Sequence, residues 1–98
     1  MNWSSILTFG GAYSNHIAAT AYAAHLFGLH SIGIIRGEEL ANKPLNPTLE
    51  KAQSLGMQLH FVSRNEYRLR DDANYLQKLG HQFPETFIIP EGGTNQLA

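Results

Sequence analysis

The stretch Leu7-Thr8-Phe9-Gly10-Gly11-Ala12-Tyr13-Ser14-Asn15-His16 decides the fold of this chain. It begins inside a short apolar run at residues 6–9, crosses two adjacent glycines and enters a segment with helical periodicity at residues 15–27. An apolar or small residue recurs on one face of that helix, at Ile17, Ala21 and Ala24. A buried strand joined to such a helix is typical of the first unit of an alternating α/β fold.

The rest of the chain repeats this unit. Apolar runs rich in β-branched and aromatic residues, at residues 31–35, 58–62 and 86–89, predict three more buried strands. Strands that alternate with helices imply right-handed crossovers and a parallel sheet covered on both faces. The 98 residues therefore predict one small domain, a three-layer α/β/α sandwich around a four-stranded parallel sheet, in the order β-α-β-α-β-α-β.

The helix boundaries are predicted from capping residues. Gly28 is a natural stop for the first helix. Asn46 and Pro47 mark the start of a second helix that continues to Gly56, because Asn caps free amide groups and Pro loses no hydrogen bond at the first helical position.

A third helix is predicted over residues 65–79, closed by Gly80. Its expected apolar face consists of Leu69, Ala73, Leu76 and Leu79. Its charged side chains, expected to form a solvated surface, are Arg68, Arg70, Asp71 and Asp72. The one long irregular stretch, residues 36–45, is interpreted as a surface connection, with a mobile lid as the alternative.

Composition excludes several classes of function. The net charge is −1 with His neutral, and no basic stripe is present, which argues against nucleic acid as a partner. No cysteine is present, and the five histidines show no metal-ligand spacing, so no metal site is expected. No apolar run approaches the roughly 20 residues that span a bilayer, and no signal peptide is recognisable, so we expect a cytoplasmic protein without a membrane partner.

Ligands of an open parallel sheet bind beyond the carboxyl ends of its strands. Four segments are expected at that edge, at residues 10–14, 36–39, 63–65 and 90–95. In the first of them, adjacent glycines allow a ligand to approach the backbone closely. Ser14 and Asn15 then stand at a helix start, where free amide groups favour an anionic oxygen. The alternative is that one of these two residues only caps the helix, which is worth about 1 kcal/mol.

Common nucleotide-binding motifs do not fit this turn. A dinucleotide fold needs a third glycine, and a P-loop needs a Lys after the glycines; both are absent. A phosphoacceptor domain would need an acidic residue at the end of the first strand, where Phe9 and Gly10 stand.

Two runs carry a family resemblance. The stretch from Leu7 to His16 resembles the strand, turn and helix of the 1-aminocyclopropane-1-carboxylate deaminase and D-cysteine desulfhydrase family of pyridoxal-phosphate enzymes, which have the tryptophan synthase β-like fold. The second run, Phe87-Ile88-Ile89-Pro90-Glu91-Gly92-Gly93-Thr94-Asn95, resembles the return of that family from its small domain to its large domain. The chain is therefore identified as a small-domain fragment of a two-domain enzyme of this family.

The resemblance implies roles for the residues of both runs. Asn15 would bind the ring hydroxyl oxygen of pyridoxal phosphate, and His16 would pack near the cofactor. Ser14 would contact the substrate carboxylate or act as nucleophile or proton carrier. The remaining expected cleft residues are Gly11, Tyr13, Glu91, Gly92, Gly93 and Thr94. A core position for His16 and a hinge role for the second run are the alternatives.

One family feature has no counterpart. The family places its Schiff-base lysine shortly before the first strand, whereas the lysines of this chain are Lys43, Lys51 and Lys78. Covalent catalysis of this kind requires that amine. We therefore expect the chain to be inactive alone, without bound cofactor, and to need a missing large domain in a parent enzyme that is a homo-oligomer.

The parent would release ammonia and a 2-keto acid from a small amino acid, or sulfide as well if it is the desulfhydrase. A non-catalytic module that binds a small anion, or a purely structural domain, are the other hypotheses.

Overall fold

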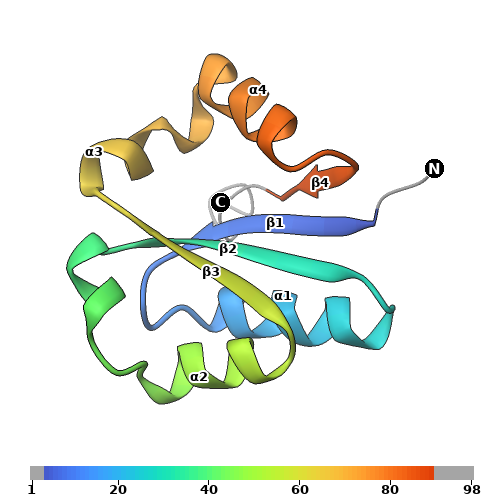
Figure 1. Ribbon diagram of the computed structural model, residues 1–98, viewed down its shortest axis with the longest axis vertical. Helices are drawn as coiled ribbons and strands as arrows, with labels where there is room; N and C mark the ends of the chain where they lie inside the picture. The colour runs from blue at the N-terminus through green and yellow to red at the C-terminus, as the bar shows by residue number, and fades with distance from the viewer. Residues whose placement is uncertain (1–3, 90–98) are drawn as a thin grey trace, which may run out of the picture.

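Four parallel strands form one sheet in the order β3-β2-β1-β4 in the computed structural model, which describes residues 4–89 (Figure 1). The strands are β1 (Ser5–Gly10), β2 (His30–Arg36), β3 (Met57–Val62) and β4 (Thr86–Ile88). All neighbouring pairs are parallel, with Leu7 opposite Ile32 and Ile88. The predicted four-stranded parallel sheet is therefore confirmed.

Helices cover both faces of this sheet. The helical elements are α1 (Asn15–Leu26), η1 (Glu38–Asn42), α2 (Pro47–Ser54), α3 (Arg64–Tyr67), η2 (Arg68–Asp71) and α4 (Ala73–Gln82). Figure 1 shows α1 and α2 on one face, α3 and α4 on the other, and the carboxyl ends of β1, β2 and β3 at the same end of the sheet. The three-layer α/β/α architecture is confirmed.

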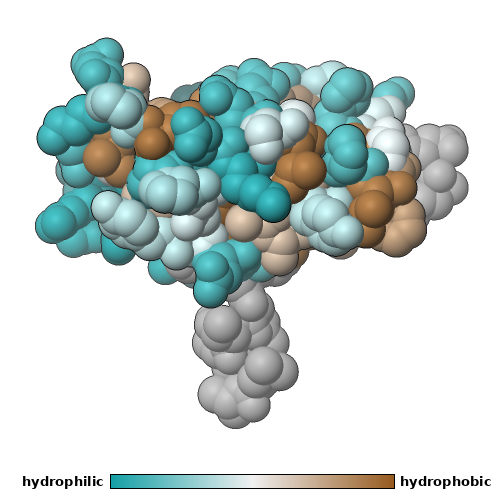
Figure 2. Space-filling model, turned by 90° about the horizontal axis from the view of Figure 1, so that it is seen from below, coloured by the Kyte–Doolittle hydropathy of each residue, from teal (hydrophilic) through white to brown (hydrophobic). Residues whose placement is uncertain are grey.

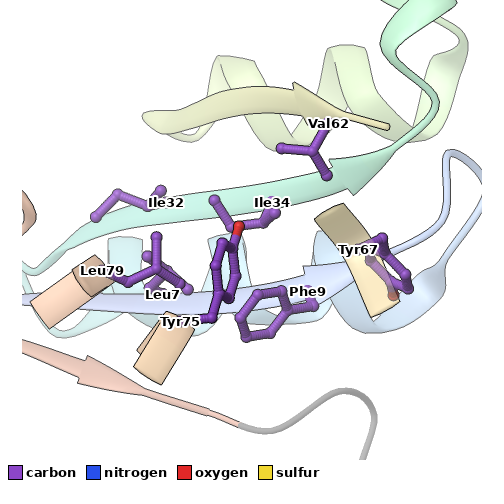
Figure 3. Packing of buried hydrophobic residues seen from close by; sticks show 8 residues of the cluster. All are labelled: Leu7, Phe9, Ile32, Ile34, Val62, Tyr67, Tyr75 and Leu79. Atoms are coloured by element: carbon purple, nitrogen blue, oxygen red, sulfur yellow. The ribbon is translucent and has the colours of Figure 1, made fainter. Parts of the chain in front are cut away.

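The core lies in two clusters, one on each face of the sheet. Alternating residues of β1 and β2, such as Leu7, Phe9 and Ile34, point toward α4, where they meet Tyr75 and Leu79 (Figure 3). The opposite face buries Ile17, Ala21, Ile35, Leu49, Ala52 and Met57 between the sheet and the pair α1 and α2. The predicted inner face of α1 is thereby confirmed.

Both predicted caps of the first two helices are present. Helix α1 ends where Gly28 adopts φ +70°, and the amide of Leu29 donates to the carbonyl of Ala24 over 2.9 Å, as in a Schellman motif. At the start of α2 the Asn46 side chain accepts a hydrogen bond from the amide of Leu49.

The prediction of one long third helix is wrong. Two short helices, α3 and α4, replace it, with η2 between them, because Asp72 has an extended backbone (ψ 128°) and caps α4 by accepting from the Tyr75 amide over 3.0 Å. Gly80 lies inside α4 instead of closing it. Leu69 and Ala73 are exposed, and the buried residues of this face are Tyr67, Tyr75 and Leu79.

Replacing Asp72 with Ala is expected to lower the free energy of unfolding by about 1 kcal/mol, the usual value of an N-cap hydrogen bond. The neighbouring Asp71→Ala is the matched control, because the Asp71 side chain caps no helix in the described residues. Urea unfolding of both variants measures the difference. Equal stability of Asp72→Ala and Asp71→Ala would show that the Asp72 cap does not stabilise the start of α4 after η2.

The outer face of α1 and α2 is largely polar, with separate hydrophobic patches (Figure 2). The large apolar side chains that the end of α1 exposes are Tyr22, Leu26 and Phe27. Among the helices of residues 4–89, none is long and apolar enough to cross a membrane.

Candidate functional site

The turn after β1 is held close to the sheet. Its amide at Ser14 donates to the carbonyl of Gly11 over 3.2 Å. A Cβ at Gly10 would stand 2.6 Å from Cγ1 of Ile17, so only glycine allows α1 to begin this close to the strand. The adjacent glycines therefore fix where the first turn of α1 lies relative to the sheet edge.

Ser14 and Asn15 stand at the start of α1 as predicted. Ser14 is the N-cap by backbone conformation, but its side chain makes no capping hydrogen bond, and it is half-buried. Asn15 is the first helical residue and is exposed. Within residues 4–89, the Ser14 side chain therefore does not serve as a helix cap. The first turn of the 12-residue helix α1 presents its free amide groups at the carboxyl edge of the sheet.

His16 ties this helix start to the sheet. Its Nε2 lies 2.8 Å from Oγ1 of the buried Thr8, and that hydroxyl donates to the carbonyl of Ile89 over 3.1 Å. Because the hydroxyl has one hydrogen, both bonds form together only in the His16 tautomer that carries a proton on Nε2 and donates it to Thr8. The His16 ring thus connects α1, β1 and the end of the described chain in one hydrogen-bonded line.

Asn46 is a residue whose part in this site the sequence did not reveal. Its Oδ1 accepts from the Leu49 amide, and its Nδ2 donates to the carbonyl of Ala12, both over 2.9 Å. One side chain therefore caps α2 and holds the turn after β1. The capping signal was visible in the sequence, but the second bond joins residues 34 positions apart and depends on the packing of α1 against α2.

A cavity of about 580 Å³ opens at the carboxyl edge of the sheet. Its walls come from three of the segments predicted there, and its lining residues are Ala12, Tyr13, Arg36, Gly37, Glu38, Glu39, Leu40, Ser63 and Arg64. Tyr13 is 79% exposed and also borders a second hollow beside Lys43 and Asn46. The irregular stretch that contributes Glu38 and Glu39 includes the short helix η1.

The predicted site residues divide into three groups. Tyr13 lines the cavity, and Gly11 lies beside it, since its Cβ position would be 3.8 Å from Nη2 of Arg36. Ser14, Asn15 and His16 stand on the same turn but do not line the cavity wall. The remaining four, Glu91, Gly92, Gly93 and Thr94, lie outside the described residues. Within residues 4–89, no group of three or more His, Cys, Asp or Glu side chains could hold a metal ion.

Comparisons with known proteins relate almost the whole chain to part of larger ones. No family model matches it. It is 34% identical over 96 residues to a protein of Thermotoga maritima named putative 1-aminocyclopropane-1-carboxylate deaminase, covering 96% of this chain and 30% of that protein. It is 33% identical over 100 residues to the bifunctional D-cysteine desulfhydrase/1-aminocyclopropane-1-carboxylate deaminase, mitochondrial, of Arabidopsis thaliana, covering 95% of this chain and 25% of that one.

The fold has a counterpart among solved structures. The crystal structure of a homologue of 1-aminocyclopropane-1-carboxylate deaminase matches 90% of this chain and 26% of that one, with a TM-score of 0.67 and 23% sequence identity. The chain thus spans between a quarter and a third of the length of the proteins it matches.

Proposed function

We propose that this chain is the small domain of an enzyme of the 1-aminocyclopropane-1-carboxylate deaminase and D-cysteine desulfhydrase kind. The reason is that it is homologous over almost its whole length to a segment of such proteins. The enzyme would use pyridoxal phosphate to convert a small amino acid into ammonia and a 2-keto acid. D-cysteine desulfhydrase activity, with release of sulfide, is the second candidate, since the Arabidopsis relative carries both activities in its name.

The observation that carries this proposal is the helix start that Gly10 places at the carboxyl edge of the sheet. The Ser14 side chain is not used for capping, and Asn15 is exposed beside it. An anionic ring oxygen of pyridoxal phosphate fits such a place, because free amide groups and the helix dipole favour negative charge there. Asn15 would hold that oxygen through its side-chain amide.

The other residues of the turn would hold the substrate. When bound, pyridoxal phosphate withdraws electrons from the substrate carbon next to the amino group. Ser14 would donate a hydrogen bond to the substrate carboxylate or carry a proton at its hydroxyl. His16, fixed by its bond to Thr8, would keep the first turn of α1 at a constant distance from the sheet. Asn46 would do the same for the turn from the side of α2.

The covalent anchor for the cofactor would come from outside this domain. Lys51 and Lys78 are exposed on α2 and α4, and Lys43, in the connection before α2, borders the same hollow as Tyr13. None of them precedes β1, where the family resemblance places the lysine. We therefore expect residues 1–98 alone to be inactive, and a large domain to supply the amine and the phosphate-binding loop.

Replacing Asn15 with Ala in the complete enzyme tests this function. The loss of a hydrogen bond to a charged oxygen, worth about 1.5–3 kcal/mol, would weaken cofactor binding about tenfold or more and lower turnover. Spectroscopic titration with pyridoxal phosphate and an assay for ammonia and keto acid measure the two effects.

Asn74→Ala is the matched control for that experiment, since Asn74 is an exposed residue of α4, on the opposite face of the sheet from α1. It should change neither quantity. Unchanged cofactor affinity and turnover in Asn15→Ala would contradict the proposed role of this helix start. Ammonia release with 1-aminocyclopropane-1-carboxylate, compared with sulfide release from D-cysteine, separates the two candidate activities.

A further inference from the structure

A further cavity, of about 470 Å³, shares Arg36 and Arg64 with the 580 Å³ cavity. Its described lining residues are Arg36, Arg64, Tyr67, Arg68 and Arg70. Four arginines and one tyrosine thus share this wall, and no acidic side chain is among its described residues. This concentration of positive charge contrasts with the net charge of −1 of the whole chain.

The fold brings these arginines together from separate segments. Arg36 is the last residue of β2, and it pairs in register with Val62 at the end of β3. The chain then enters α3 with Arg64, and η2 adds two more arginines at the same end of the sheet (Figure 1). The arginines therefore meet because the carboxyl ends of β2 and β3 lie side by side. Parallel sheets bind ligands at this edge.

A buried tyrosine orients two of the four side chains. Tyr67 is 4% exposed and packs edge-on against Phe9, with ring centroids 6.4 Å apart and planes at 79° (Figure 3). The guanidinium of Arg70 lies 4.5 Å from the Tyr67 ring centroid and donates to the Tyr67 carbonyl over 3.0 Å. Arg36 lies 5.7 Å from the same centroid. Stacking on a fixed ring restricts the side chains before any ligand arrives, which lowers the entropic cost of binding.

The acidic side chains of the neighbouring described segments do not line this cavity. Glu66, beside Tyr67 in the chain, accepts a hydrogen bond from the Tyr75 hydroxyl over 2.9 Å. Glu38 and Glu39 line the first cavity and not the second. Within residues 4–89, Arg36, Arg64 and Arg68 make no ion pair with any carboxylate, so their guanidinium groups are available to an anionic ligand as far as that part of the chain is concerned.

We propose that this arginine cavity binds a phosphate-type oxyanion, either free phosphate or the head of a small phosphomonoester. Guanidinium groups suit phosphate because their planar forks donate two parallel hydrogen bonds to its oxygens. A dianion also compensates more of the clustered charge than a single carboxylate does. The volume exceeds that of the ion alone and leaves room for a small organic group. This site is separate from the helix start at Ser14 and does not depend on the proposed function.

Calorimetric titration of the full 98-residue chain with inorganic phosphate at low ionic strength tests the proposal. We expect saturable binding with one site per chain. The double variant Arg64→Gln/Arg68→Gln should weaken it about tenfold or more, because both side chains lose their charge and their charge-assisted hydrogen bonds to the ion. Both residues are exposed, and circular dichroism checks that the variant remains folded.

The control variant Lys51→Gln/Lys78→Gln removes the same charge from exposed positions on α2 and α4. It should bind phosphate as the unmodified chain does. Absence of saturable binding, or equal weakening in both double variants, would overturn the proposal. Parallel titrations with glycerol 3-phosphate and succinate define the ligand. Tighter binding of glycerol 3-phosphate than of phosphate identifies a phosphomonoester site. Succinate binding as tightly as phosphate would overturn the assignment to phosphate.

Discussion

Gly10→Ala is expected to destabilise the protein by about 1–3 kcal/mol, the usual cost of forcing an extra group into a packed core. The added Cβ would stand 2.6 Å from Cγ1 and 2.9 Å from Cδ1 of Ile17, and 3.1 Å from Cβ of Ser14. Ile17 is fully buried, and its branched Cβ leaves little choice of χ1, so its side chain cannot move aside. The strain must therefore be relieved by moving the first turn of α1 away from β1.

Gly80→Ala provides a control with the opposite sign. Gly80 lies inside α4, and within residues 4–89 its Cβ position has no atom within 4 Å other than those of its chain neighbours and the backbone of its own helix. Alanine there should stabilise the protein by about 0.5–1 kcal/mol, because glycine loses more backbone entropy than alanine in a helix. Denaturant unfolding measures both changes. If Gly10→Ala is as stable as the unmodified protein, the close contact between strand and helix does not position the turn.

The close packing at Gly10 also explains why this part of the fold could be predicted from sequence. Adjacent glycines between an apolar run and an alanine-rich helix have few structural interpretations, and the strand, the turn and the inner face of α1 are all where the pattern placed them. The start of α2 was equally predictable, because Asn46 and Pro47 act through local hydrogen bonding and backbone geometry.

The third helix was not predictable in the same way. The spacing of Leu69, Ala73, Leu76 and Leu79 is helical, but Asp72 offers its side chain to the Tyr75 amide and starts a new helix there. Tyr67 and Tyr75 then fill the positions on the sheet that Leu69 and Ala73 were expected to occupy. The local cap at Asp72 thus starts a new helix, although the helical spacing of apolar residues runs through this position in the sequence.

The candidate site shows the same division between local and distant information. The position of the turn residues at the carboxyl edge of the sheet could be predicted from the sequence. The hydrogen bond from Asn46 to Ala12 could not, because it depends on how α2 packs beside α1. The sequence pattern predicts only a solvated surface for Arg68 and Arg70. Their meeting with Arg36 and Arg64 arises from the adjacency of β2 and β3, which hydrophobic periodicity does not encode.

The strongest dependence of stability on pH is expected from Tyr75. Burial raises the pKa of its hydroxyl well above the ordinary value of 10.0, and the hydrogen bond to the Glu66 carboxylate together with its negative charge raises this pKa further. The folded protein therefore holds this proton more tightly than the unfolded chain does. The resulting stabilisation is fully present below about pH 10 and is lost as the pH rises above that value, by up to about 1.4 kcal/mol per pH unit.

Tyr75→Phe should abolish this part of the fall in the free energy of unfolding above about pH 10. At neutral pH it should lower the free energy of unfolding by about 1.5 kcal/mol, the lower end for a hydrogen bond to a charged group. The lower end applies because Glu66 is exposed and its carboxylate returns to water. Tyr22→Phe, at a position that is 53% exposed on α1, is the matched control and should leave both the neutral stability and the slope unchanged.

Urea unfolding of the three proteins between pH 7 and pH 11 separates the contributions. Apart from these two tyrosines, all three proteins carry the same ionisable groups, so the difference between Tyr75→Phe and Tyr22→Phe isolates the buried hydroxyl. A parallel decline of all three above pH 10 would mean that the folded protein holds the Tyr75 proton no more tightly than the unfolded chain does. In that case the packing of α4 against the sheet would rest on the apolar contacts of Tyr75 and Leu79 with Leu7, Phe9 and Ile34 alone.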